Sequence, residues 1–228
     1  MSNLVGLNVG LSDSLSAKTR RFADYYRQLA NGTIKEVYDD ETVTLGLCFY
    51  RSQVEKVTFT RCTKIVNYGA FTACVALSHV DFPELISIGV WTFQDTHKLS
   101  YAFLPKVVSV GANGFIRSGI EEVELPKCTT LGSSVFGACK NLKKVKIPVC
   151  KTIEKSVFSE CSALEEIFLG GVTVVPSLIN SNALNGTPDT LKIIVPDNLV
   201  DSFKTATNWS TYAGRIIGVS EYEATQVQ

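Results

Sequence analysis

The sequence predicts an α+β repeat solenoid, in which short coils of chain stack along one axis with a parallel β-sheet on one face and helical caps at both ends. Three observations predict this class. One phrase of apolar residues recurs roughly every 22 residues between Val54 and Leu169, and a fixed period of this length is typical of solenoids. A proline and then a phenylalanine recur within the phrase. Both flanks of the repeats lose the period and carry helix signals.

Each coil starts with an apolar residue, and two further apolar positions follow it after three and five residues. The coil starts are Val54, Leu77, Leu99, Ile120, Leu142 and Leu164. The second positions are Val57, Val80, Ala102, Val123, Val145 and Ile167. Because β-branched and aromatic residues dominate around the second and third positions, we expect one short strand in each coil there.

Proline and glycine mark where each strand ends and the chain turns. The prolines that follow the third position are Pro83, Pro105, Pro126 and Pro148. Proline cannot donate a hydrogen bond to a neighbouring strand, so it ends the strand. An apolar-glycine step comes next, and we expect it to allow a tight turn because glycine tolerates backbone angles that other residues avoid. The apolar residues near this step are Val66, Ile88, Val110, Leu131 and Ile153.

A column of phenylalanines is expected to fill the interior of the stack. Its members are Phe71, Phe93, Phe115, Phe136 and Phe158. Stacked coils would place neighbouring strands about 4.8 Å apart in one parallel sheet. The core would then be continuous along the repeats, which are expected to form a single domain after a shorter, degenerate coil at Ile34–Phe49.

The repeat phrase resembles the BspA-like, treponemal type of leucine-rich repeat. The stretch from Leu142 to Cys161 reads L-K-K-V-K-I-P-V-C-K-T-I-E-K-S-V-F-S-E-C and fits that motif apart from Glu154, where the motif has glycine. Leu77–Thr96 fits except at its last residue. The resemblance implies a right-handed leucine-rich-repeat stack. Family members are mainly bacterial surface or phage-associated proteins with roles in adhesion and partner binding, and the repeat carries no catalytic residues.

The two ends of the chain are predicted to cap the stack, because terminal coils would otherwise expose apolar edges. We assign residues 1–32 to an N-terminal helical cap, 33–190 to the repeats, 191–220 to a C-terminal strand and helix, and 221–228 to a frayed tail. In the first cap, Ser16 would begin a helix and Gly32 would follow its end. The apolar face of that helix would be Leu15, Phe22, Tyr25, Tyr26 and Leu29.

The C-terminal cap is expected to start with a strand at Leu191–Val195. Asp197 would cap the following helix. Three large side chains would then close the end of the core: Trp209, Tyr212 and Ile216.

Composition and motifs exclude several classes of function. Lys plus Arg equals Asp plus Glu at 22 each, so the chain has no basic footprint for nucleic acid. Its apolar runs are too short for membrane insertion. The cysteines recur at two positions of the repeat that other coils fill with small or apolar residues, which indicates packing rather than disulfides or a metal site. With two histidines and no catalytic motif, we predict no enzyme activity and no cofactor.

The candidate binding site lies on the outward side of the predicted sheet. Side chains alternate along a strand, so the residues on either side of the second apolar position face outward. Tyr101 and Phe103 are an aromatic pair there, and exposed aromatic residues are typical anchors for partners. The neighbouring outward residues complete an aromatic strip with acidic edges: His79, Asp81, Glu122 and Glu124. A cap or loop that covers the two rings is the alternative. Farther along, Glu122–Lys144–Glu166 and Glu124–Lys146 are expected to stack as columns of alternating charge.

We therefore predict a binding module that recognises a macromolecule through its sheet face. A protein partner with basic residues suits the strip best, and a carbohydrate is the second choice. A rigid spacer in a phage or cell envelope remains an alternative. The N-terminal residues Met1–Gly10 lack the features of a signal peptide, whereas the family resemblance favours a secreted or surface location, so the compartment stays open.

Overall fold

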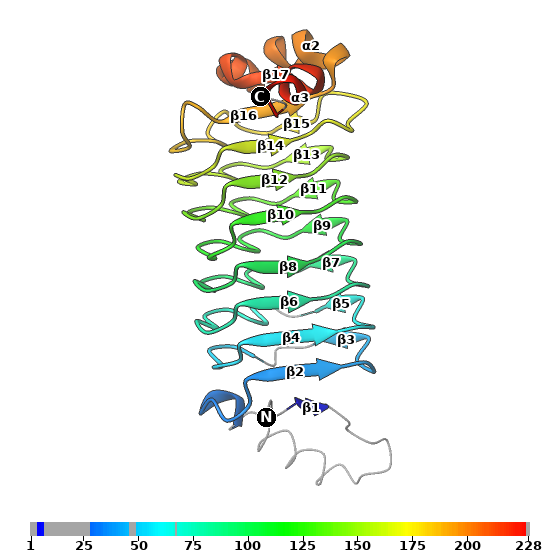
Figure 1. The fold of residues 1–228 in the computed structure, drawn as a ribbon, viewed down its shortest axis with the longest axis vertical. Coiled ribbons are helices and arrows are strands. Elements are labelled where there is room, and N and C mark those ends of the chain that lie inside the picture. The colour runs from blue at the N-terminus through cyan, green and yellow to red at the C-terminus, as the bar shows by residue number, and fades with distance from the viewer. Residues whose placement is uncertain (1–3, 7–27, 46–48, 67, 227–228) are drawn as a thin grey trace.

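The computed structural model describes residues 4–6, 28–45, 49–66 and 68–226. In this part of the chain the coils stack into one elongated solenoid (Figure 1), as the repeat period predicts. Each coil of the repeat contributes a front strand and a shorter back strand. All strand pairs are parallel, because every coil returns to its start in the same direction.

The front strands form two sheets of five strands each. The first runs in the order β1 (Leu4–Gly6), β2 (Glu36–Asp39), β4 (Lys56–Phe59), β6 (His79–Asp81) and β8 (Tyr101–Phe103). The second runs β10 (Glu122–Glu124), β12 (Lys144–Lys146), β14 (Glu166–Phe168), β16 (Lys192–Val195) and β17 (Ile216–Gly218). The middle residue of each repeat strand points into the core, as predicted.

The back strands form one continuous sheet of seven strands, which the sequence did not indicate. They are β3 (Thr44–Leu45), β5 (Lys64–Ile65), β7 (Ser87–Ile88), β9 (Ser109–Val110), β11 (Thr130–Leu131), β13 (Thr152–Ile153) and β15 (Ser177–Leu178). The prediction of one strand per coil was therefore wrong. The sequence did not indicate the second strand because two residues are too few to show an alternating pattern.

One position of the apolar column on the back strands differs from the prediction. Ile65 is buried at 3% exposure, whereas Val66 is 48% exposed. Lys64 pairs with Ser87, which places Ile65 beside Ile88 in the column. The assignment of Val66 to the core was wrong, because these two coils are one residue farther apart than the usual period.

The glycines after the back strands have a different role from the one predicted. A positive φ is found two residues later in the turn, at Trp91, Asn113 and Ser134. At Gly111 a Cβ atom would lie 2.9 Å from the backbone carbon of Gly89 in the coil below. Glycine is therefore needed there so that successive coils can approach closely, and not for its backbone angles.

The predicted phenylalanine column is confirmed and extends to Phe49. Its rings are almost fully buried and stack nearly parallel. Ring centroids of neighbours lie 4.8 Å apart for Phe49–Phe71, 5.3 Å for Phe71–Phe93, 5.0 Å for Phe93–Phe115, 5.5 Å for Phe115–Phe136 and 5.7 Å for Phe136–Phe158. The six cysteines that the structure describes are free and buried, in agreement with a packing role.

The C-terminal cap consists of η1 (Asp197–Leu199), α2 (Val200–Thr205), η2 (Trp209–Arg215), β17 and α3 (Val219–Gln226). Trp209 is buried, as predicted, and its Nε1–H donates to the carbonyl of Pro176 at 2.7 Å. Asp197 does not cap η1; its carboxylate accepts hydrogen bonds from Ser220 at the start of α3. The segment from residue 221 onward, which was expected to be a frayed tail, belongs to α3 and is helical through Gln226.

At the other end, the structure describes only the last turn of the predicted helical cap. Residues 28–30 are helical and Leu29 is buried at 1% exposure. Gly32 follows with φ of 76°, the left-handed conformation that commonly ends a helix. The rest of the predicted helix, with Ser16 and most of its apolar face, lies outside the described residues.

Candidate functional site

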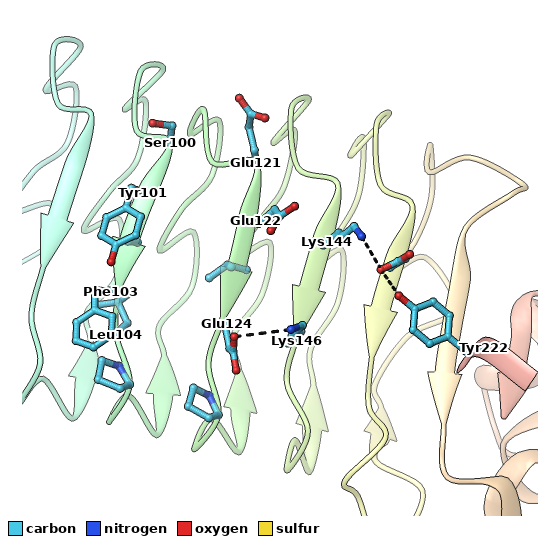
Figure 2. Close-up of a pocket in the computed structure, with 15 residues that line it drawn as sticks. Ser100, Tyr101, Phe103, Leu104, Glu121, Glu122, Glu124, Lys144, Lys146 and Tyr222 are labelled. Atoms are coloured by element: carbon cyan, nitrogen blue, oxygen red, sulfur yellow. Dashed lines mark hydrogen bonds and ion pairs between the residues drawn. The ribbon is translucent and has the colours of Figure 1, made fainter. Parts of the chain in front are cut away.

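The front face places the six predicted site residues on three neighbouring strands, β6, β8 and β10. Figure 2 shows four of them: Tyr101, Phe103, Glu122 and Glu124. On β6 and β8, His79 lies beside Tyr101 and Asp81 lies beside Phe103 in register. Tyr101 is 50% exposed and Phe103 is 43% exposed, and the part of the chain that the structure describes does not cover them. These four residues form the aromatic strip on one side of the site. Glu122 and Glu124 lie on β10, across a break in the sheet.

The residues of β6 support the two aromatic side chains of β8. The rings of His79 and Tyr101 lie 5.7 Å apart at 37°. The imidazole of His79 also contacts Ser78, whose Oγ lies 2.8 Å from His79 Nδ1. Asp81 has a buried Oδ1 without a hydrogen-bond partner among the described residues, and this burial raises the pKa of its carboxyl group.

The break between β8 and β10 interrupts an otherwise regular front face. Figure 1 shows these two strands farther apart than other neighbouring front strands, while the back sheet continues past them. Tyr101 N–H donates to Ser78 at 3.2 Å, and Phe103 C=O accepts from Phe82 at 3.0 Å. Both bonds go to the β6 side. Because backbone groups alternate along a strand, the N–H and C=O of Ala102 face the break.

The edge of β10 is open in the same way. Leu125 N–H donates to Lys146 C=O at 2.9 Å on the β12 side. By the same alternation, the backbone groups of Glu122 and Glu124 face β8. Within the described residues these two strands are not paired, so donors and acceptors line both sides of the break.

A shortened connection enters β10. Only Gly119 separates Ser118 from the coil start at Ile120, where the coil below has two residues in the same place. Gly119 N–H donates to Thr96 C=O at 3.0 Å, and a Cβ atom at Gly119 would lie 2.1 Å from the carbonyl oxygen of His97. The chain is thus drawn against the coil below at the edge of the stack, and the front strands separate beside it.

Replacing Gly119 with alanine should therefore destabilise the protein by about 1–3 kcal/mol, the usual effect of forcing a group into filled space. Urea unfolding would measure the change. Gly214→Ala is the matched control, because a Cβ atom there meets nothing within 4 Å. Equal stability of the two variants would contradict the close approach at Gly119.

The break opens into a groove of about 820 Å³ on the front face (Figure 2). Its charged lining consists of four glutamates and two lysines: Glu121, Glu122, Glu124, Glu166, Lys144 and Lys146. The chain as a whole is neutral, so the groove is an acidic region of a neutral protein. The groove also reaches Tyr222 of α3.

The predicted charge columns are present in register, with Glu122, Lys144 and Glu166 on successive strands. Lys144 Nζ lies 3.3 Å from Glu166, so its ion pair is with Glu166 and not with Glu122. Its hydrogen bond to Glu166 raises the pKa of Lys144. Tyr222 Oη also donates to Glu166, at 2.9 Å. Such exposed pairs contribute about 0–1 kcal/mol each, so they orient side chains more than they stabilise the fold.

Sequence reasoning named the six predicted site residues but missed the break, Glu121 and Tyr222. The signals for the break were the short step of 21 residues from Leu99 to Ile120 and the small Ala102 in a column of larger side chains. Tyr222 had no repeat context, since it lies in a segment expected to be frayed.

A second exposed aromatic pair lies in the turns that follow the back strands. Tyr68 is 69% exposed and Trp91 is 45% exposed, and their ring centroids lie 5.9 Å apart. Trp91 has φ of 58°, where the equivalent residues of later coils are Asn113, Ser134 and Ser156. This pair is away from the groove and offers a matched control for the strip.

The described residues show neither a metal cluster nor a membrane span. No group of three His, Cys, Asp or Glu side chains among them is placed to hold a metal ion. None of the described helices is long and apolar enough to cross a membrane.

Comparison with solved structures shows the same fold in a bacterial protein. The leucine-rich-repeat protein of T. pallidum matches with a TM-score of 0.58 and 20% identity, over 68% of this chain and 79% of that one. A leucine-rich-repeat protein of Bacteroides ovatus has a TM-score of 0.47 and 19% identity, over 75% of this chain and 42% of that one. No curated protein matches the chain. The family model of the BspA type leucine-rich repeat region matches residues 46–165 and 102–208 in six copies, and the chain therefore belongs to the BspA-type leucine-rich-repeat family.

Proposed function

We propose that the protein recognises a protein partner with basic residues through its front face, at the aromatic strip and the acidic groove beside it. The leucine-rich-repeat family suggests a protein-interaction module, and its repeats are typically non-enzymatic. The observation that carries the proposal is the position of Tyr101 and Phe103. Both rings are about half exposed and lie at the edge of the break.

The aromatic rings supply apolar contact area that a partner can cover. Exposing two neighbouring aromatic rings to water is unfavourable, and a partner that covers them removes this cost. Aromatic residues dominate the binding energy of many interfaces. The other exposed side chains on the front face of this protein are mostly charged. A partner that covers the strip therefore buries more apolar area than it would elsewhere on this face.

The charge of the groove selects the kind of partner. Its four glutamates outnumber its two lysines, which favours lysine or arginine on the partner and disfavours acidic segments. Lys144 and Lys146 already have partners in Glu166 and Glu124, at 3.3 and 3.9 Å. A basic partner thus meets carboxylates beside aromatic rings, where cation–π contact adds to the ion pairs.

Changing Tyr101 and Phe103 together to serine should weaken partner binding at least thirtyfold, or about 2 kcal/mol. Stability should change by only about 0.5 kcal/mol, because exposed side chains leave no cavity. A displayed library of random peptides, selected on the unmodified protein, supplies the ligands. We expect the selected peptides to be rich in lysine and arginine, and circular dichroism checks that the variant is folded.

The matched control is Tyr68→Ser with Trp91→Ser, which removes two exposed rings that do not line the groove. Serine is already present at the position equivalent to Trp91 in two later coils, at Ser134 and Ser156. This control should retain binding. Equal binding by the strip variant and the control would overturn the proposal, and a glycan array with the same variants would reveal carbohydrate recognition instead.

A further inference from the structure

We propose that the break between β8 and β10 receives an extended, lysine- or arginine-bearing segment of the partner, whose main chain pairs with the free edges of both strands. This inference rests on the proposed front-face recognition and specifies how the partner is held. It follows from the backbone of the break, from the side chains around it and from the way the two halves of the stack are joined.

The free edges present both donors and acceptors. Ala102 offers an N–H and a C=O on the β8 side, and Glu122 and Glu124 offer the same groups on the β10 side, as the bonds to the outer neighbours require. Unpaired strand edges are templates for an added strand. A side chain alone could satisfy some of these groups, whereas a main chain carries the alternating donors and acceptors that match them all.

The side chains around the break select a basic segment. Tyr101 and Phe103 line one side at the front, and Glu122 and Glu124 line the other. Alternate side chains of an inserted strand would point to the front between these rows. A lysine or arginine there can lay its apolar stem on a ring and direct its charge to a carboxylate.

The break is narrower than an inserted strand needs, so β8 and β10 must move apart on binding. Two strand spacings require about 9.6 Å, and Cα atoms of β8 and β10 approach within 8 Å. The opening must therefore be at least about 2 Å, and it breaks no β8–β10 ladder because the two strands are unpaired. The back strands β9 and β11 remain paired behind it and provide the hinge.

The test uses the full chain with isotope-labelled amides and a synthetic peptide of about seven alternating lysine and valine residues, near the usual strand length. A second peptide has the same sequence with every other backbone amide methylated, which blocks main-chain pairing along one of its two edges and keeps the charges. A third has glutamate in place of lysine. Peptide affinity and amide hydrogen exchange are measured by nuclear magnetic resonance.

We expect the basic peptide to bind at least tenfold more tightly than the methylated and the acidic peptides. The amides of Ala102 and Glu124 should exchange at least tenfold more slowly in the complex, while Val145, inside the continuous ladder, should not change. Equal affinity of the methylated peptide, unchanged exchange at Ala102 and Glu124, or no binding of the basic peptide would each overturn this inference.

These outcomes leave the proposed function separately testable. Side-chain recognition by the strip predicts that the Tyr101→Ser and Phe103→Ser variant loses the library-selected ligands, whether or not their main chains pair with the sheet. Conversely, if the variant binds those ligands as tightly as the unmodified protein does, the proposed function is overturned, whatever the affinity of the methylated peptide.

Discussion

Replacing Phe136 with alanine is expected to lower the free energy of unfolding by about 3–5 kcal/mol. The ring is fully buried and stacks between Phe115 at 5.5 Å and Phe158 at 5.7 Å. Its removal leaves a cavity that neither neighbour can fill, since each is already held by the next ring of the column. Urea unfolding followed by circular dichroism measures the loss.

The loss should also spread beyond one coil, because each coil of a solenoid is stabilised by its neighbours. Hydrogen exchange should therefore speed up on both sides of the substituted coil. Phe103→Ala is the matched control, since this ring is 43% exposed and its loss should change stability by less than about 1 kcal/mol. Similar stability of the two variants would contradict the assignment of the column.

The parts of the fold that the sequence predicts are those that repeat. Phe136 stacks on the rings at the same position of both neighbouring coils, so one repeating pattern of the sequence predicts both the period and the core. The front strands follow from the same logic, because their middle residues must all point inward. Val66 shows where this reasoning fails: a coil one residue longer moves its neighbour Ile65 into the column, and both are apolar.

The break could not be predicted from coil length alone. The connection Ser52–Gln53–Val54 is as short as Ser118–Gly119–Ile120, yet the strand that follows it, β4, pairs normally with β2. What differs is the coil below, whose His97 carbonyl lies against Gly119. Such a contact between coils depends on three-dimensional stacking, so the sequence predicted the aromatic strip but not the groove beside it.

Raising the pH above 9 is expected to destabilise the protein steeply, because the fold holds its thiols in their neutral form. Burial raises the pKa of Cys74, Cys128 and Cys139 from 9.0 to about 11. Burial also raises the pKa of Cys150, to about 12. Each of these cysteines lies in the core, where a thiolate would have few groups to solvate it.

The direction of the effect follows from proton binding. Below pH 9 the thiols are protonated in both the folded and the unfolded chain, and their contribution to stability is complete. Between pH 9 and about 11 the unfolded chain loses these protons while the folded chain keeps them, so the unfolded state gains stability. Each thiol contributes about 1.4 kcal/mol per pH unit in this window.

Each of these four thiols should lower the free energy of unfolding by about 2 kcal/mol between pH 8.5 and about 10.5. Urea unfolding in the presence of a reductant measures the decline. Lysines and tyrosines also titrate at these pH values, so the comparison is with Cys139→Ser, which keeps a small polar group of the kind that Ser118 provides in the coil below. Because this variant lacks one of these buried thiols, its stability should fall by about 2 kcal/mol less over the same range. An identical decline in the variant would show that ionisation of Cys139 does not limit stability at alkaline pH.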